Sequence, residues 1–252
     1  MLKALITGAS SGIGLDMAKI LAREKHELIL VSRDKEKLQK LQKELDTNVK
    51  IIVVDLSIES KLKELYILCK KENIDILINN AGFGDCGIFY DTDISKDIDM
   101  INVNIKALHV LTKLFLKDMK KNNSGYILNV ASAAAFSPGP LMATYYATKS
   151  YVLKLTESIY EELRREKSNI VISCLCPGPV KTNFDKTANV KFSMKALSSE
   201  FVAEYAVREM FNKKLIIIPG FKMKVVYLFT KIMPLKFLAK ISYKFQKKKI
   251  YK

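Results

Sequence analysis

Two side chains in the middle of the chain have the chemistry to move a proton. Tyr145 and Lys149 lie four residues apart, so both leave the same face of the chain if the segment is helical. Tyrosine alone has a pKa of about 10 and is a poor acid or base at neutral pH, but a nearby ammonium favours the phenolate and lowers that pKa. Tyr146 has Ser150 at the same spacing and lacks a cationic partner. Tyr145 is therefore the predicted general acid or base.

A glycine-rich segment follows the first strand-like run of the chain. Its glycines allow a tight turn and a close approach of the backbone to a pyrophosphate, and the following helix supplies free N–H groups and a partial positive charge. No Gly-Lys-Ser/Thr follows, which excludes a P-loop. A plain glycine-rich turn is the alternative. The segment predicts a dinucleotide site, with the cofactor contacting Gly8, Ser10, Ser11, Gly12, Ile13 and Gly14.

The end of the second predicted strand bears on the choice of cofactor. An acidic residue there would bind a ribose 2′-hydroxyl and repel a 2′-phosphate, but Ser32 and Arg33 stand in its place. A guanidinium suits a phosphate because it has a permanent charge and a fork of donors. Lys37, one helical turn further on, is expected to assist. These residues predict NADP(H), and a solvated surface arginine is the alternative.

Small and polar residues also end the next two predicted strands. Asp55 and Leu56 follow the third strand, and Asn80 precedes Ala81 and Gly82 after the fourth. Asp55 is placed to accept a hydrogen bond from an adenine amino group. Ala81 and Gly82 are small enough for their backbone to lie against a ribose. All five residues are predicted cofactor contacts.

Taken together, these motifs resemble the short-chain dehydrogenase/reductase family, over about residues 1–220. Ser132 lies thirteen residues before Tyr145, which is the separation that this family leads one to expect. Two positions depart from the family pattern: Ala107, where glycine is frequent, and Ser11, where many NADP-dependent members carry a basic residue. The second departure leaves Arg33 with more of the phosphate binding. The matching elements are Thr7-Gly8-x3-Gly12-x-Gly14, Asn79-Asn80-Ala81-Gly82, Asn104, Ser132, Tyr145-x3-Lys149 and Pro177-Gly178-x3-Thr182.

The resemblance implies an enzyme that interconverts a carbonyl and an alcohol, acting on CH–OH groups with NADP as acceptor. Tyr145 would give a proton to the carbonyl oxygen as hydride arrives from the nicotinamide, and Ser132 would orient that oxygen. Lys149 would lower the tyrosine pKa and bind the nicotinamide ribose, and Asn104 would hold a water that links Lys149 to solvent. The carboxamide of the cofactor would be fixed by Pro177, Gly178, Val180 and Thr182.

Other classes of protein fit less well. A serine hydrolase on such a sheet needs a histidine after its serine, but His26 and His109 both precede Ser132. A nucleic-acid-binding protein is suggested only by charge, without any zinc, RRM or helix-turn-helix signature. No metal site is expected either. A non-catalytic NADP sensor or scaffold is the remaining alternative, although it would not need both Tyr145 and Lys149.

The elements that must position these residues alternate along the chain. Several strand-length runs are continuous in Ile, Val and Leu, as in parallel strands covered on both faces. Asp34 and Ser198 are expected helix N-caps. The pattern predicts an α/β fold, a Rossmann-like, doubly wound, seven-stranded parallel sheet with helices on both faces. Predicted strands are Leu2–Thr7, Glu27–Ser32, Lys50–Asp55, Asp75–Asn79, Tyr126–Ala131, Ile170–Cys176 and Lys214–Ile218, and predicted helices cover about 12–25, 34–45, 58–72, 98–121, 144–166 and 198–212.

The length of 252 residues and the apolar content of 49% suit one catalytic domain over residues 1–220, followed by a tail over 221–252. The first residues run straight into a strand without a signal peptide, and the four cysteines are too scattered for a disulfide framework. A cytoplasmic protein is therefore expected. From the resemblance we also expect a homo-oligomer, either a dimer or a tetramer.

Two regions bear on the substrate and on partners. The segment 179–197 is expected to form a substrate lid, and its apolar residues favour a lipid-, acyl- or steroid-like carbonyl compound; the alternative is that they only pack the lid itself. The tail holds ten of the lysines and no acidic residue, in a chain of net charge +16, and beyond Pro234 it forms a basic amphipathic helix. That helix lies on an anionic membrane or docks on the protein. The lid and neighbouring residues are Val180, Phe184, Val190, Phe192, Met194, Phe83, Phe136, Leu141 and Met142, and the helix has Phe237, Leu238, Ile241 and Phe245 on its apolar face.

Overall fold

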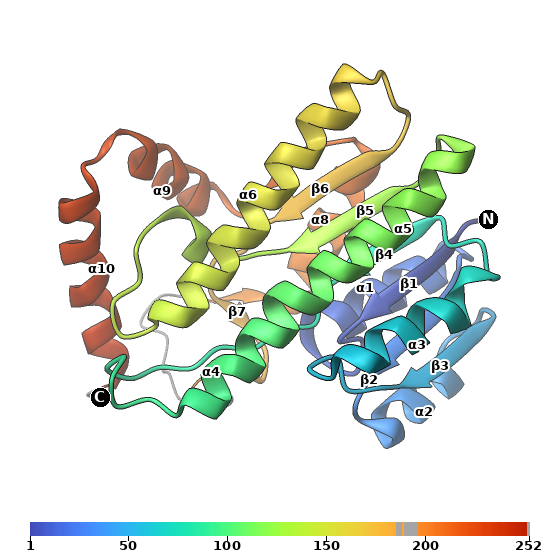
Figure 1. The fold of residues 1–252 in the computed structure, drawn as a ribbon, viewed down its shortest axis with the longest axis horizontal. Helices are drawn as coiled ribbons and strands as arrows, with labels where there is room; N and C mark the ends of the chain where they lie inside the picture. The colour runs from blue at the N-terminus through green and yellow to red at the C-terminus, as the bar shows by residue number, and fades with distance from the viewer. Residues whose placement is uncertain (185–187, 189–195, 251–252) are drawn as a thin grey trace.

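The computed structural model of the chain describes residues 1–184, 188 and 196–250. Seven strands form one twisted sheet in the order β3-β2-β1-β4-β5-β6-β9, and each neighbouring pair is parallel (Figure 1). The chain builds outward from β1 to β3, then returns to the other side of β1 at β4. This switch point is where ligands of doubly wound sheets bind, outside the carboxyl ends of the strands. The predicted fold is confirmed.

All seven predicted strands are present in the sheet. They are β1 (Lys3–Thr7), β2 (Glu27–Ser32), β3 (Val49–Val53), β4 (Ile76–Asn79), β5 (Tyr126–Val130), β6 (Val171–Leu175) and β9 (Ile216–Ile217), and a separate parallel pair consists of β7 (Val180–Lys181) and β8 (Leu197–Ser198). The helices are α1 (Gly12–Arg23), α2 (Lys35–Glu44), α3 (Glu59–Lys70), α4 (Ile94–Ile101), α5 (Leu108–Asn122), α6 (Ala143–Arg165), α8 (Ser199–Phe211), α9 (Phe221–Ile232) and α10 (Leu235–Ile250), with a π-helical turn at Asn102–Ala107 and a 3-10 turn at Ala133–Phe136.

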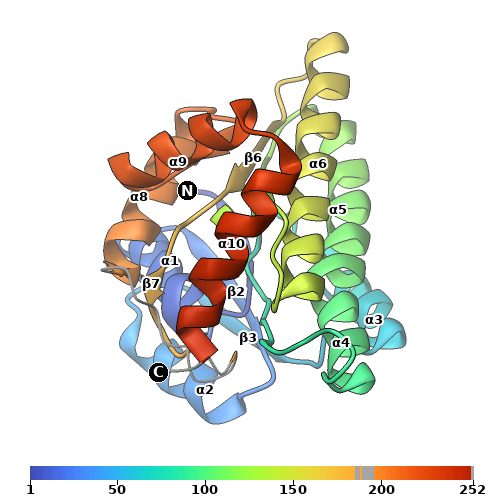
Figure 2. The same ribbon diagram turned by 90° about the vertical axis from the view of Figure 1, so that its left-hand side faces the viewer.

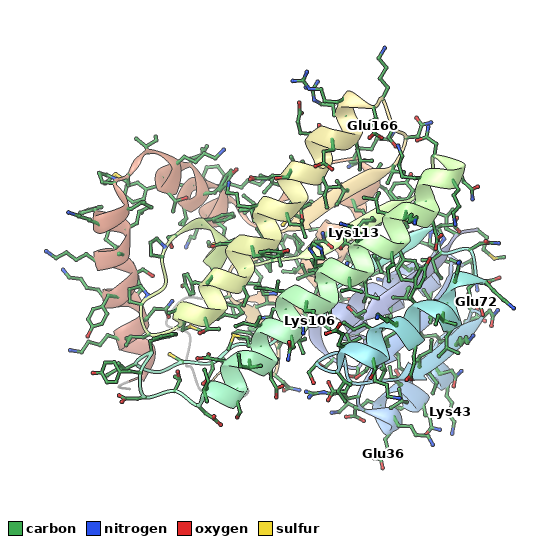
Figure 3. The ribbon with its side chains drawn as sticks, in the orientation of Figure 1. Glu36, Lys43, Glu72, Lys106, Lys113 and Glu166 are labelled. Atoms are coloured by element: carbon green, nitrogen blue, oxygen red, sulfur yellow. The ribbon has the colours of Figure 1, made fainter. Side chains whose placement is uncertain are left out.

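Strand β1 illustrates why the runs are continuously apolar. Ala4 and Ile6 lie in one core with residues of α1, α2 and α8, whereas Leu5 between them packs with residues of α3 and α5 on the other face. All three side chains are fully buried. Successive side chains of a strand point to opposite faces, so helices on both faces require apolar residues at every position. Charged residues are exposed, such as Lys113 on α5 and Glu166 at the end of α6 (Figure 3).

Both predicted N-caps are confirmed. The Asp34 carboxylate accepts a hydrogen bond from the Lys37 N–H at the start of α2, and the Ser198 hydroxyl caps α8 through the Phe201 N–H. The predicted helix over 98–121 is wrong in two respects. It begins earlier, at Ile94, because Asp93 caps it, and it contains the π-helical turn. Such turns are rare and have no sequence signature of their own.

The two C-terminal helices lie beyond the carboxyl ends of the strands, at the left of Figure 1, and α10 crosses in front of the sheet in Figure 2. Pro234 separates them, since a proline cannot continue the preceding helix. Leu238 of α10 is buried. Within the described parts of the chain, we find no helix with the length and apolar character needed to cross a membrane. Of the predicted apolar face of α10, Leu238 docks on the protein, whereas Phe237 and Phe245 are 44% and 51% exposed, so the structure shows one of the two predicted arrangements only in part.

Candidate active site

A cavity of about 740 Å³ lies at the carboxyl ends of the strands. Loops after β1, β2, β3, β4, β5 and β6 contribute to its wall, and α9 and α10 close it on the side away from the sheet. Three of the predicted site residues, Gly14, Lys37 and Asn104, do not line it. The predicted residues that do line it are Gly8, Ser10, Ser11, Gly12, Ile13, Arg33, Asp55, Leu56, Asn80, Ala81, Gly82, Ser132, Tyr145, Lys149, Pro177, Gly178, Val180 and Thr182.

The glycine loop is held from behind by Asn80. The Asn80 amide donates hydrogen bonds to the Thr7 and Gly8 carbonyl oxygens at 3.0 and 3.1 Å. Gly14 packs against that amide so closely that a Cβ atom there would lie 2.3 Å from Asn80 Nδ2. The N-terminus of α1 has no side-chain cap, so its first N–H groups are available to an anion. This geometry fits a dinucleotide pyrophosphate, with Asn80 acting mainly by positioning the loop.

The end of the cavity beyond β2 and β3 carries the charged residues. The Arg33 guanidinium lies 3.7 Å from the Asp55 carboxylate, and its side chain is 70% exposed. Burial alone would raise the pKa of Asp55, but hydrogen bonds from Ser57 and the charge of Arg33 lower it. Lys37 forms an ion pair with Asp34 at 2.6 Å instead of facing the cavity. Of the two predicted cations, Arg33 lines this end of the cavity and Lys37 does not.

Tyr145, Ser132 and Lys149 come together at the centre of the cavity. The Ser132 hydroxyl hydrogen-bonds to the Tyr145 phenol, and Lys149 Nζ lies 5.9 Å from the centre of the Tyr145 ring. Lys149 Nζ also donates to the Val130 carbonyl oxygen at 2.9 Å. Both Tyr145 and Lys149 are buried. Residues from β5, the turn after it and α6 therefore converge on one point.

Burial controls the ionisation of this group. It raises the pKa of Tyr145 well above its ordinary value, and the hydrogen bond from Ser132 offsets only part of that rise. Burial also lowers the pKa of Lys149 to about 8. Lys149 is not among the groups that shift the Tyr145 pKa here, so the lowering of the tyrosine pKa by Lys149 stays a prediction. The protein favours the protonated phenol, the form that donates a proton.

Asn104 ties two other parts of the site together from the π-helical turn. Its amide accepts from the Phe83 N–H at 3.1 Å and donates to the Phe83 carbonyl oxygen at 2.9 Å and to Thr148 Oγ1 at 3.1 Å. Gly82 lies between Asn104 and Lys149, and a Cβ atom on it would meet Asn104 Oδ1 at 2.9 Å and Lys149 Nζ at 3.2 Å. Gly82 is therefore required by space, and Asn104 positions the loop after β4.

The remaining wall of the cavity is largely apolar. Of the predicted substrate-side residues, Val180, Phe184, Phe83 and Met142 line it, whereas Phe136 packs on Tyr227 at 4.6 Å between ring centres and Leu141 does not reach it. Val190, Phe192 and Met194 fall outside the described residues. The sequence did not predict that α9 contributes to this wall, or that polar residues of α10 do. The added residues are Met223, Val226, Phe229, Thr230, Ser242 and Gln246, with Tyr146 beside them.

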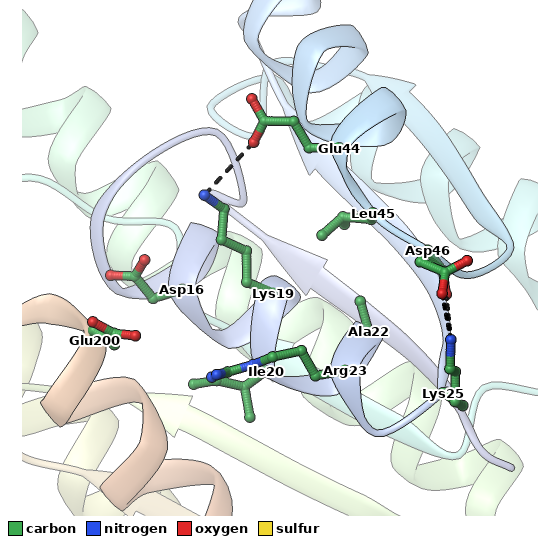
Figure 4. A pocket seen from close by; sticks show the side chains of 10 residues that line it. All are labelled: Asp16, Lys19, Ile20, Ala22, Arg23, Lys25, Glu44, Leu45, Asp46 and Glu200. Carbon is green, nitrogen blue, oxygen red and sulfur yellow. Dashed lines mark hydrogen bonds and ion pairs between the residues drawn. The ribbon is translucent and has the colours of Figure 1, made fainter.

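A second hollow, of about 530 Å³, lies against α1 and α2 (Figure 4). Its two lysines pair with acidic residues of the same hollow: Lys19 with Glu44 at 3.6 Å and Lys25 with Asp46. Such exposed pairs are ordinary surface interactions worth at most about 1 kcal/mol. The hollow contains none of the predicted catalytic or cofactor residues, so the larger cavity is the candidate active site.

Comparison with known proteins agrees with this site. Residues 3–192 match the family described as short chain dehydrogenase. The chain belongs to this family. An uncharacterized oxidoreductase of Staphylococcus epidermidis is 34% identical over 182 residues, which make up 71% of this chain and 78% of that protein. This short-chain dehydrogenase is thus an oxidoreductase with a nucleotide-binding, Rossmann-like fold.

Solved structures of similar proteins contain either cofactor. A short-chain dehydrogenase from Sphingobium yanoikuyae in complex with NADPH is 29% identical, with a TM-score of 0.84 and coverage of 92% of both chains. The bulky-bulky ketone specific alcohol dehydrogenase from Comamonas testosteroni is 28% identical, with a TM-score of 0.77 and coverage of 92% of this chain and 95% of that one. A Burkholderia phymatum family member in complex with NAD shares the fold at 23% identity and a TM-score of 0.82, covering 90% of this chain and 92% of that one.

Proposed function

We propose that this short-chain dehydrogenase is an NADP(H)-dependent reductase of an apolar carbonyl compound. The observation that carries the proposal is the buried group of Tyr145, Ser132 and Lys149 facing the same cavity as the glycine loop. The nicotinamide supplies the hydride when bound. Ser132 then holds the substrate oxygen by a hydrogen bond, and Tyr145 Oη gives its proton to that oxygen. The proposed use of NADP(H) supports the direction of reduction, and the Tyr145 phenol is protonated at neutral pH, as its donor role requires.

The other predicted residues have supporting roles in this proposal. Lys149 places a positive charge beside the phenolate that remains after proton transfer, and it binds the nicotinamide ribose. Asn104 holds the water that links Lys149 to solvent. Its side chain also hydrogen-bonds to Phe83 and Thr148. Pro177, Gly178, Val180 and Thr182 hold the carboxamide. The N-terminus of α1 would hold the pyrophosphate, and Asp55 and Leu56 would lie beside the adenosine.

The substrate is proposed from the wall of the cavity. Phe83, Met142 and Phe184 come from the core of the fold, and Leu238 and Ile241 come from α10. An apolar wall stabilises a bound apolar substrate by about 25 cal/mol for each Å² of apolar surface removed from water. A similar protein from Comamonas testosteroni is specific for bulky ketones, which supports a bulky apolar ketone here.

The test of this function is NADPH oxidation with a panel of ketones and aldehydes, followed by absorbance. We expect turnover of bulky apolar ketones, slower turnover of acetone-sized ones, and a preference for NADPH over NADH. A protein that binds NADPH but turns over none of these compounds would favour the alternative, a non-catalytic sensor or scaffold. Preference for small polar carbonyls would contradict the apolar substrate.

The variant Arg33→Ala tests the preference for NADPH over NADH. Removing the guanidinium should raise the KM for NADPH by about tenfold or more and change that for NADH by less than about twofold, because a charge-assisted bond to phosphate is worth about 1.5–3 kcal/mol. Lys35→Ala, an exposed change two residues away, is the matched control. Equal effects of Arg33→Ala on the two cofactors would contradict the role of Arg33 and the choice of NADP(H).

We also propose that the protein is cytoplasmic and can attach to an anionic membrane surface through the outer face of α9 and α10. Phe221, Ile232 and Leu235 are strongly exposed there, and ten lysines without an acid occupy residues 221–252. A second copy of this surface would be repelled by its like charge, whereas anionic lipids attract each lysine by about 1 kcal/mol. The full chain should float with phosphatidylglycerol vesicles at low salt and be released at high salt. Equal flotation with phosphatidylcholine vesicles would contradict this.

A homo-oligomer, either a dimer or a tetramer, remains part of the proposal. Ile94, Ile98 and Ile101 of α4 are large exposed apolar side chains away from α9 and α10, and they support self-association at another face. The molar mass in solution, measured by light scattering, distinguishes an oligomer from a monomer.

A further inference from the structure

Three polar side chains meet on the apolar side of the active-site cavity. Gln246 and Ser242 of α10 both hydrogen-bond to the Tyr146 phenol, Gln246 through its Nε2 amide group. All three line the cavity. Residues 242 and 246 are one helical turn apart, and Leu238 lies one turn before them, so one face of α10 points inward. The sequence marked this face only by its apolar residues.

One atom of this group lacks a partner. Gln246 is 1% exposed, and its Oε1 atom has no hydrogen-bond partner among the described residues. A buried carbonyl oxygen without a partner is costly, and native proteins rarely leave one unpaired. Nearby wall residues such as Leu238 and Ile241 are apolar, so they offer no donor. The Oε1 atom is therefore an unpaired, buried acceptor on a residue that lines the cavity.

The Gln246 Oε1 acceptor lies near the place where the substrate carbonyl reacts. Tyr146 follows Tyr145 directly, and the centres of their rings lie 6.2 Å apart. Tyr145 faces the substrate oxygen in the proposed reaction, and Tyr146 carries Gln246 on its far end. A substrate that reaches both places must extend beyond its carbonyl group by several bonds. Its body between the two points would contact the apolar residues of α10.

We propose that Gln246, held by Tyr146, forms a subsite for a hydroxyl group of the substrate. The hydroxyl donates its hydrogen bond to Gln246 Oε1. The substrate class is a bulky, mainly apolar ketone with one hydroxyl remote from the carbonyl. This inference rests on the proposed carbonyl reductase function and adds a specificity-determining residue to it. A site built to pair with a hydroxyl discriminates strongly against the analogue that lacks it, because its own polar group then stays unpaired.

The experiment compares three bulky cyclic ketones with one skeleton: one with a remote hydroxyl, one with hydrogen at that position, and one with a methoxy group. The methoxy oxygen cannot donate. For the full-length protein we expect kcat/KM and affinity, measured by calorimetry with NADPH present, to favour the hydroxy ketone by about tenfold over both analogues. In Gln246→Leu the preference should fall to about one. Tyr146→Phe, which removes the partner of the Gln246 amide, should lose part of it.

Lys244→Leu is the matched control, because it places the same new side chain on the exposed face of α10. It should keep the tenfold preference. Thermal unfolding and NADPH affinity establish that each variant is folded. Equal affinity of the wild type for the three ketones, or an unchanged preference in Gln246→Leu, overturns the subsite. Hydroxyl-dependent binding without any NADPH oxidation would overturn the proposed reductase function and support the subsite.

Discussion

Tyr145→Phe should lower kcat for carbonyl reduction by about a thousandfold, the middle of the range for general acid–base catalysis, and leave NADPH affinity within about twofold. The variant keeps the aromatic ring, which packs on Phe184 at 5.3 Å between ring centres, and loses only the proton donor and its bond with Ser132. Single-turnover NADPH oxidation and NADPH fluorescence titration measure the two quantities separately.

Tyr151→Phe provides the control for this substitution. Tyr151 lies on the same helix, α6, and its hydroxyl pairs with His109 at 2.8 Å on the outer side of the fold. The same chemical change there should leave kcat within about twofold. If Tyr145→Phe also keeps a near-native rate, another group donates the proton and the proposed mechanism is wrong.

Lys149→Met should have opposite effects on activity and stability. Met lacks the ammonium that stabilises the phenolate and binds the ribose, so we expect kcat/KM to fall by about a hundredfold or more. The same change should raise the free energy of unfolding at pH 7. Burial lowers the Lys149 pKa from 10.5 to about 8, which corresponds to about 3 kcal/mol of penalty for the buried charge. Loss of the hydrogen bond to the Val130 carbonyl destabilises the variant by about 1 kcal/mol. The net increase in the free energy of unfolding is therefore about 1–2 kcal/mol.

The stability gain of Lys149→Met should depend on pH. Between pH 8 and pH 10.5 the unfolded chain binds the Lys149 proton more readily than the folded protein, so wild-type stability contributed by this group rises with pH. The full penalty applies below pH 8 and disappears above pH 10.5. The stability gain of Lys149→Met in urea unfolding should therefore be larger at pH 7 than at pH 10.

Lys154→Met is the control for both effects. Lys154 is one and a half turns further along α6, with a side chain that is 75% exposed and paired with Glu157. Its loss should change stability by less than about 0.5 kcal/mol and leave activity unchanged. A Lys149→Met protein that is less stable than the wild type at pH 7 would mean that the buried ammonium stabilises the fold, contrary to our interpretation.

The sheet shows how far local pattern alone can lead. Continuous apolar runs such as that around Leu5 predicted strands with both faces covered, and all seven were found in the parallel sheet. Spacing also placed Tyr145 and Lys149 on one face of a helix. Spacing could not show the ionisation state of Tyr145, because desolvation is set by everything that packs around the phenol.

Contacts that periodicity does not report account for the rest. Lys37 was expected near the phosphate by helical spacing, but Asp34, three residues away, binds its ammonium. Asn104 lies in a π-helical turn that packing forms without a local signal. The pairing of Gln246 with Tyr146, one hundred residues apart, depends on how α10 docks, which no periodicity reports.

The sequence by itself determined the strands, the glycine loop and the Tyr145–Lys149 pair, since each depends on residues within a few positions of one another. The tertiary structure alone decided three things: that burial raises the pKa of Tyr145, that Asn80 and Asn104 hold loops in place, and that α9 and α10 close the cavity. The physical reason is the same in each case. Desolvation, hydrogen bonding across the fold and the packing of amphipathic faces depend on which distant residues meet, and only the folded chain brings them together.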